Sequence, residues 1–203
     1  MTSDTPRFHH YILAGGQSQR FGSDKARYKV DGQAMLQRVA ECFAPISCST
    51  TIVAQTAGAY DDLGYPTIAD AVSNAGPLAG LLTALLHVKT TAQNQDECTA
   101  PTTQTNDWIL LSSCDLIHAS ADMVPHLTEL TDGNILAVVF TRSKRYEPFP
   151  GLYHVSLLPH VEQAISDNQL SYQRLFRGLD KLIASPELPG AYETLDMDYR
   201  PNE

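Results

Sequence analysis

The stretch LAGGQSQRFGSDK, residues 13–25, decides how the rest of this chain is interpreted. It overlaps a short apolar run, residues 9–14, that is typical of a buried β-strand. Its pair of glycines lets the backbone turn sharply and present amide groups to a phosphate without side-chain obstruction. Arg20 and Lys25 can then neutralise phosphate oxygens, the guanidinium as a fork and the ammonium as a point charge. The spacing is neither that of the Walker loop nor that of the Rossmann glycines, yet it predicts a loop that holds a phosphorylated ligand.

The rest of the chain alternates between short apolar runs and segments with helical periodicity. Strands are indicated at 9–14, 51–54, 65–69, 107–111, 135–141, 153–155 and 181–184, and helices at 34–43, 76–88, 123–130, 156–166 and 171–178. Strands that alternate with helices predict an α/β fold, a three-layer α/β/α sandwich with a mostly parallel sheet. Ligands of such sheets bind at the carboxyl ends of strands, so the residues that follow each strand are the candidates for a site.

Length and composition suit one globular domain over residues 1–203. Hydrophobic residues make up 43% and charged residues 18%, which argues against wholesale disorder. No apolar run approaches the roughly 18 residues of a membrane span, and the N-terminus lacks the apolar stretch of a secretory signal. We therefore expect a cytoplasmic protein with no membrane partner, whose four cysteines are reduced thiols.

The charge is uneven along the chain. A net charge of −9 argues against a nucleic-acid partner, whose binding depends on clustered Lys and Arg. Between Gln17 and Arg38 the basic residues are Arg20, Lys25, Arg27, Lys29 and Arg38, against Asp24 and Asp31. Positive charge kept in one segment of an acidic protein can attract a small polyanion, although a solvated helix face and loop would show the same charges.

Residues 90–106 are polar, rich in Thr, Gln and Asn, and show no periodicity. A structureless segment of this length is unusual in a compact domain and is either functional or mobile. We interpret it as a mobile surface insert within the single domain.

Three further sites follow predicted strands. Asp70 follows the strand at 65–69, where an aspartate taken alone is more often a helix cap or loop residue than a ligand contact. Residues 76–80, Gly-Pro-Leu-Ala-Gly, open a helix with small residues that would let a flat base or a ribose approach closely. Asp115 follows the strand at 107–111, where its carboxylate either suits a hard cation such as Mg²⁺ or caps the next helix.

Two other chemistries are disfavoured. Cys114 has no His beside it in the sequence, and a small buried cysteine is common, so we do not assign it as a nucleophile. The seven His residues show no metal-binding spacing, so a zinc site is not expected.

Taken together, these segments resemble the molybdenum cofactor guanylyltransferase family, within the larger group of sugar-phosphate and cofactor nucleotidyltransferases. The resemblance covers most of the chain. It rests on Leu-Ala-Gly-Gly-x-Ser-x-Arg-Phe-Gly-x-Asp-Lys-Ala at 13–26, the Asp70 segment with Gly-Pro-Leu-Ala-Gly at 76–80, Cys-Asp ending at Asp115, and Glu-Pro-Phe-Pro-Gly-Leu-Tyr at 147–153. The fold that the resemblance implies is a Rossmann-like nucleotidyltransferase fold.

The resemblance also implies the residues of the site. Catalytic roles fall to Lys25, Asp115 and Arg20, and Asp115 would hold Mg²⁺. Nucleotide contacts fall to Leu13, Ala14, Gly15, Gly16, Lys25, Asp70 and Asp115. The implied reaction joins GMP from GTP to the terminal phosphate of molybdopterin and releases pyrophosphate, with molybdoenzyme-delivery proteins as further partners to consider.

The chain departs from the family pattern in two places. Relatives often carry Asn after the second strand, where this chain has Gln55. Relatives commonly end in a segment like Asn-Ile-Asn-Thr-Pro, where this chain has Asp196 and Asp198 among residues 195–200. Ionised aspartates cannot donate hydrogen bonds and would repel a phosphorylated acceptor, so we hypothesise weaker acceptor binding, or a modified molybdopterin as acceptor, with GTP binding intact.

Two rival functions are weighed against this one. The first is another nucleotidyltransferase, such as a molybdopterin cytidylyltransferase or a sugar-phosphate enzyme. Relatives that use CTP usually read Leu-Ala-Ala-Gly, whereas Gly15 stands here and favours GTP. The second rival is a nucleotide-binding regulatory module without turnover, which the presence of both Lys25 and Asp115 disfavours.

Overall fold

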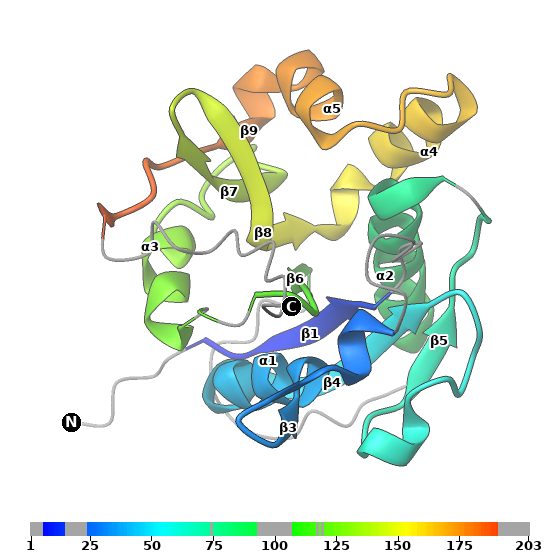
Figure 1. Ribbon diagram of the computed structural model, residues 1–203. Coiled ribbons are helices and arrows are strands. Elements are labelled where there is room, and N and C mark those ends of the chain that lie inside the picture. The colour runs from blue at the N-terminus through cyan, green and yellow to red at the C-terminus, as the bar shows by residue number, and fades with distance from the viewer. Residues whose placement is uncertain are drawn as a thin grey trace.

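A twisted sheet forms the centre of the molecule, with strand order β5-β4-β1-β6-β8-β7-β9 (Figure 1). The computed structural model describes residues 6–14, 24–73, 75–92, 107–116, 118 and 120–190. The strands are β1 Phe8–Leu13, β2 Lys29–Val30, β3 Gln33–Ala34, β4 Ser47–Ala54, β5 Thr67–Ala69, β6 Trp108–Ser113, β7 Ala137–Arg142, β8 Arg145–His154 and β9 Ile183–Ala184. The α-helices are α1 Met35–Phe43, α2 Gly76–Ala92, α3 Val124–Thr128, α4 Leu158–Ser166 and α5 Tyr172–Gly178, with short 3-10 turns η1 Lys25–Arg27, η2 Ala44–Ile46, η3 Asp61–Leu63, η4 Ala121–Met123, η5 Val155–Leu157 and η6 Asp180–Leu182.

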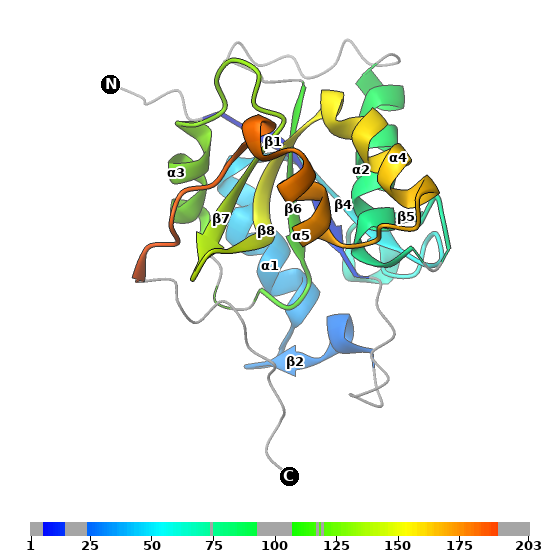
Figure 2. The same ribbon diagram turned by 90° about the horizontal axis from the view of Figure 1, so that it is seen from above.

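Helices cover both faces of the sheet. Because the side chains of successive strand residues point to opposite faces, each central strand contributes to two apolar cores. Phe8 and Ile12 of β1 pack with α1 and α3 in one apolar core. Tyr11 and Leu13 of the same strand pack with α2, α4 and α5 in the other. Figures 1 and 2 show these two helix layers on opposite sides of the sheet. The predicted three-layer α/β/α sandwich is confirmed.

The sheet is mostly parallel, as predicted. Strand β1 pairs parallel with β4 on one side and with β6 on the other. Strand β5 pairs parallel with β4, and β9 pairs parallel with β7. Strand β8 is the exception, since it runs antiparallel to both β6 and β7. The strand expected at 153–155 overlaps only the end of β8, which begins at Arg145 although Pro148 and Pro150 cannot donate to a ladder.

A bulge reconciles these prolines with a strand in the interior of the sheet. Val139 of β7 lies opposite Gly151, but the next residue, Phe140, lies opposite Glu147. Residues 148–150 therefore lie outside the ladder with β7. The missing N–H groups of Pro148 and Pro150 cost this ladder no hydrogen bond. The backbone folds back so closely that a Cβ on Gly151 would lie 2.7 Å from the Pro148 carbonyl oxygen.

Two local features differ from the expectation. Helix α2 extends to Ala92 rather than ending near Val88, so the first residues of the expected insert are helical. The rest of that insert lies outside the described residues. Strands β2 and β3 form a small hairpin that was not expected, with Asp31 and Gly32 at positive φ in its turn. Within the described residues, no helix combines the length and apolar character needed to cross a membrane.

Candidate functional site

The carboxyl ends of the parallel strands meet at one edge of the sheet, which faces the lower side of Figure 2. The hydrogen bonding of the sheet continues one residue beyond the strands. The Ala14 N–H donates to the Val53 carbonyl at 2.9 Å, and the Asp70 N–H donates to the Ala54 carbonyl at 2.7 Å. Two residues that the sequence predicted as nucleotide contacts, Ala14 and Asp70, therefore lie at this edge.

An ion pair joins two other predicted residues at the same edge. The Cys114 N–H donates to the Leu13 carbonyl at 3.1 Å, so Asp115 emerges directly beside the end of β1. The Lys25 ammonium lies 2.9 Å from Asp115 Oδ2, although the two residues are 90 positions apart in the sequence. The Ser113 hydroxyl donates to the other carboxylate oxygen. A cation suited to phosphate and an anion suited to metal are thus held side by side.

The Asp115 carboxylate fits the Mg²⁺ that the sequence analysis assigned to it. Its side chain is 39% exposed, and a carboxylate offers about four acceptor positions, of which Lys25 and Ser113 use two. No cluster of three or more His, Cys, Asp or Glu that could hold a metal occurs in the described part of the chain. Mg²⁺ is usually bound by one or two carboxylates together with waters and substrate phosphates, which suits a site with one carboxylate.

Asp70 does not reach this ion pair. Three inter-strand spacings separate β5 from β6, which places the two strand ends about 14 Å apart. Asp70 is half-buried, and burial raises the pKa of its carboxyl. The following Ala71 N–H donates to the Thr83 hydroxyl of α2 at 2.8 Å, which anchors the chain at this point. Asp70 and Asp115 would therefore contact different parts of a ligand that spans the edge.

The small residues at the start of α2 have a structural explanation. A Cβ on Gly80 would lie 2.6 Å from a methyl carbon of Leu13, so the missing side chain lets α2 pack closely on β1. Gly76 has φ +60, a backbone conformation that favours glycine. Leu13 itself is 8% exposed and its carbonyl accepts from Cys114, so its side chain belongs to the core.

Three of the predicted residues, Gly15, Gly16 and Arg20, lie outside the described residues. Their assigned roles stay predictions. The chain is described again from Asp24, whose carboxylate accepts a hydrogen bond from the Ala26 N–H at 3.0 Å and caps the turn η1 that carries Lys25.

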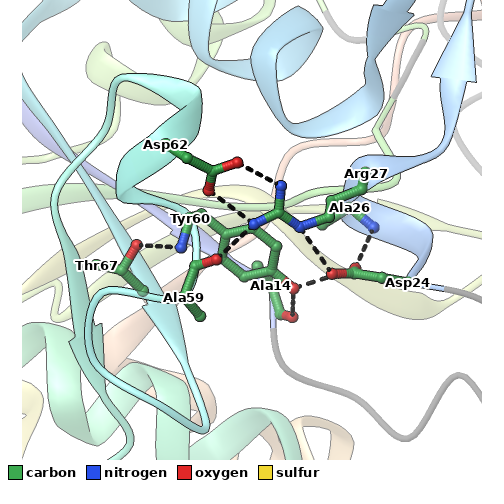
Figure 3. A network of polar contacts seen from close by, with 8 residues as sticks. All are labelled: Ala14, Asp24, Ala26, Arg27, Ala59, Tyr60, Asp62 and Thr67. Atoms are coloured by element: carbon green, nitrogen blue, oxygen red, sulfur yellow. Dashed lines mark hydrogen bonds and ion pairs between the residues drawn. The ribbon is translucent and has the colours of Figure 1, made fainter.

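Sequence reasoning missed Tyr60, which lies between β4 and β5. Its hydroxyl oxygen is 3.1 Å from Asp24 Oδ1 and 3.3 Å from the Ala14 carbonyl oxygen (Figure 3). Asp24 and Tyr60 are 36 positions apart, and no motif marks the tyrosine. The only signal in the sequence was the basic cluster around Arg27, whose guanidinium also belongs to this network.

The Cys114 thiol stays protonated in this environment. Burial and the nearby Asp115 carboxylate raise its pKa to about 12. A thiol is a poor nucleophile until it loses its proton, so the geometry agrees with leaving Cys114 out of the chemistry.

A basic hairpin turn lies at the same edge of the sheet. Because β7 is parallel to β6, its carboxyl end and the turn to β8 lie on the side of Asp115 (Figure 2). Arg142 pairs with Glu147 at 3.2 Å across the base of the turn. Lys144 and Arg145 at the tip are exposed. This turn supplies positive charge on the β7 side of Asp115, where a second anionic group could bind.

Comparison with known proteins connects this geometry to a family. The sequence model of the MobA-like NTP transferase domain matches residues 10–184. A Flavobacterium johnsoniae protein named a probable molybdenum cofactor guanylyltransferase is 26% identical over 87% of this chain and 84% of its own length. A Carboxydothermus hydrogenoformans protein of the same name is 30% identical over 75% of this chain and 68% of its own.

The fold has solved counterparts. A crystal structure of a protein from Aquifex aeolicus superimposes with a TM-score of 0.71 at 24% sequence identity, over 96% of this chain and 95% of that one. At this identity the likeness concerns the fold.

Proposed function

This chain belongs to the family of MobA-like NTP transferase domains and is a nucleotidyltransferase, and we propose that it transfers GMP from GTP to the terminal phosphate of molybdopterin. Pyrophosphate is the second product. The observation that carries the proposal is the Lys25–Asp115 ion pair of 2.9 Å at the carboxyl ends of β1 and β6. Relatives named molybdenum cofactor guanylyltransferases support the choice of nucleotide and acceptor.

The proposed reaction needs positioning and charge neutralisation more than covalent catalysis. An oxygen of the acceptor phosphate forms a bond to the α-phosphorus of GTP, and the bond from that phosphorus to the oxygen that leads to the β-phosphate breaks. The negative charge leaves with pyrophosphate. The Lys25 side chain is 17% exposed, and its ammonium can offset charge on the triphosphate.

Asp115 would bind Mg²⁺ through the carboxylate positions that Lys25 and Ser113 leave free. When bound, the ion supplies further positive charge to the phosphates and to the leaving pyrophosphate. Ser113 and Lys25 meanwhile keep the carboxylate oriented toward the edge of the sheet. Arg20 would add a second cation on the phosphate side.

The basic turn between β7 and β8 supports an anionic acceptor. Lys144 and Arg145 are exposed at the edge that carries Asp115, so a phosphorylated acceptor can be attracted there. The four cysteines show no close pairing pattern in the sequence, and we place the activity in the cytoplasm. Molybdoenzyme-delivery proteins would be the partners that receive the product.

A thermal-shift panel tests the nucleotide half of the proposal. GTP, CTP, UTP and ATP are each added with Mg²⁺, because a ligand at 100 times its Kd stabilises the folded state by about 2.7 kcal/mol. We expect GTP to give the largest shift. A larger shift with CTP would contradict the guanine assignment and favour a cytidylyltransferase.

Pyrophosphate release with purified molybdopterin and GTP tests the transfer itself. We expect release that depends on both substrates and on Mg²⁺. Binding of GTP without release would contradict the transfer and favour a regulatory module, and release with a sugar phosphate in place of molybdopterin would contradict the acceptor.

A further inference from the structure

Tyr60 contacts both ends of the chain segment that connects β1 to η1. One end is Ala14, the last described residue after β1, and its carbonyl oxygen lies 3.3 Å from the Tyr60 hydroxyl. The other end is Asp24, whose Oδ1 lies 3.1 Å from the same hydroxyl. Both partners are acceptors, so the one hydroxyl proton is shared between them, with the charged and nearer Asp24 as the stronger partner (Figure 3).

The tyrosine itself is firmly held. The residue is 6% exposed and lies in the core on the α1 side of the sheet, and its backbone N–H donates to the Thr67 hydroxyl of β5 at 3.1 Å. Burial, followed by the charge of Asp24, raises the pKa of the Tyr60 hydroxyl above its ordinary value. The hydroxyl therefore keeps its proton and remains a donor across the neutral pH range.

Arg27 braces the same network from the solvent side. Its guanidinium donates two bonds of 2.7 Å to the Asp62 carboxylate and one of 2.7 Å to the Ala59 carbonyl. It also lies 5.2 Å above the centroid of the Tyr60 ring and 3.5 Å from Asp24 Oδ2. Arg27 thus ties η1 to the connection between β4 and β5, which Figure 3 shows as one continuous set of contacts.

We propose that Tyr60 is the positioning residue of the nucleotide site, holding Asp24 against the end of β1 so that Lys25 stands beside Asp115. Asp24 and Lys25 are adjacent, and Asp24 caps the turn on which Lys25 lies. Movement of Asp24 would displace Lys25 from a pair that is now 2.9 Å long. Because positions in a site matter to within about 0.5 Å, a loosened Asp24 lowers triphosphate affinity by displacing Lys25, even though no ligand-contacting residue is replaced.

This inference rests on the proposed function, and its test compares two single-atom deletions. Tyr60→Phe removes the hydroxyl while keeping the ring and its contact with Arg27. Tyr11→Phe is the matched control, because that tyrosine is 2% exposed and its hydroxyl bonds His87 of α2 at 2.9 Å, away from η1. GTP affinity is measured with Mg²⁺ by isothermal titration calorimetry. We expect Tyr60→Phe to weaken GTP binding about five- to tenfold and Tyr11→Phe to leave it unchanged.

A nucleotide-free readout accompanies the binding measurement. Amide hydrogen exchange at Ala26 reports on the Asp24 cap, since the Ala26 N–H donates to Asp24 at 3.0 Å. Exchange should become several-fold faster in Tyr60→Phe and stay at the wild-type rate in Tyr11→Phe. If the wild-type protein bound no triphosphate, the proposed function would fail. Unchanged exchange at Ala26 in Tyr60→Phe would independently refute the role of Tyr60 in positioning Asp24.

Arg27→Lys provides a second, exposed variant that keeps the charge but loses the forked contact with Asp62. A two- to threefold loss of GTP affinity is expected, because the brace is weakened while the hydroxyl remains. Wild-type affinity in both Tyr60→Phe and Arg27→Lys would overturn the proposal. An equal loss in Tyr60→Phe and Tyr11→Phe would overturn it as well, because the effect would then reflect general destabilisation.

Discussion

Acid should destabilise this protein through His10, a residue of β1 buried at the centre of the sheet. Its side chain is fully buried, its Nε2 lies 2.8 Å from the Ser112 hydroxyl, and its ring meets Phe43 edge-on at 5.1 Å between centroids. Among the described residues, the other ring nitrogen, Nδ1, finds no hydrogen-bond partner. Burial lowers the pKa of His10 to about 3, so the folded protein keeps it neutral.

The sign and size of the effect follow from proton linkage. An unfolded histidine has a pKa of about 6.5, so below that pH the unfolded chain binds a proton that the folded chain rejects. The stability contributed by neutral His10 is therefore complete above pH 6.5 and is lost as the pH falls toward 3. Integration between pH 7 and pH 5 gives a loss of about 2 kcal/mol from this one residue.

The assay compares urea unfolding at pH 7 and pH 5 for the wild-type protein and for His10→Leu combined with Ser112→Ala. The second substitution removes the hydroxyl that would otherwise be left buried without a partner, at a cost of about 1–3 kcal/mol. Burial also lowers the pKa values of His9 and His87, but both remain in the variant and cancel in the comparison. The difference in unfolding free energy between the two pH values should shrink by about 2 kcal/mol. An unchanged difference would refute the reasoning.

Three further predictions concern the site, the bulge and the C-terminal segment. Asp115→Asn keeps the shape of the side chain but removes its charge, so pyrophosphate release should fall by orders of magnitude while circular dichroism shows an intact fold; near-normal release would contradict the metal role. Gly151→Ala places a methyl group 2.7 Å from a backbone oxygen and should cost about 1–3 kcal/mol in urea unfolding, whereas Gly178→Ala, with open space around it, should cost nothing. Asp196 and Asp198 lie outside the described residues. Replacing both with Asn should lower the KM for molybdopterin and leave GTP affinity unchanged, because two charges that repel the acceptor are removed. An unchanged KM would make these aspartates irrelevant to the acceptor.

Most of the fold could be predicted because its signals are local. The apolar runs that became β1, β6 and β7 are buried on both faces, as central strands of a parallel sheet are. The start of α2 was marked by Gly76-Pro77, since a helix accepts proline in its first turn. Strand β8 was mostly missed. Prolines at 148 and 150 disfavour a strand, and only the bulge opposite Val139 and Phe140 makes them compatible with one.

The sequence by itself determined which residues reach the functional edge. Ala14 ends one predicted strand, and Asp70 and Asp115 follow two others. Parallel strands end on one side of their sheet whatever their order. Only the tertiary structure decided which of them meet. Strand order depends on packing between segments that are far apart in the chain. In this sheet β6 is the direct neighbour of β1, whereas β4 separates β5 from β1. Lys25 therefore pairs with Asp115, Asp70 stands about 14 Å away, and Tyr60 reaches Asp24 through contacts that no local pattern encodes.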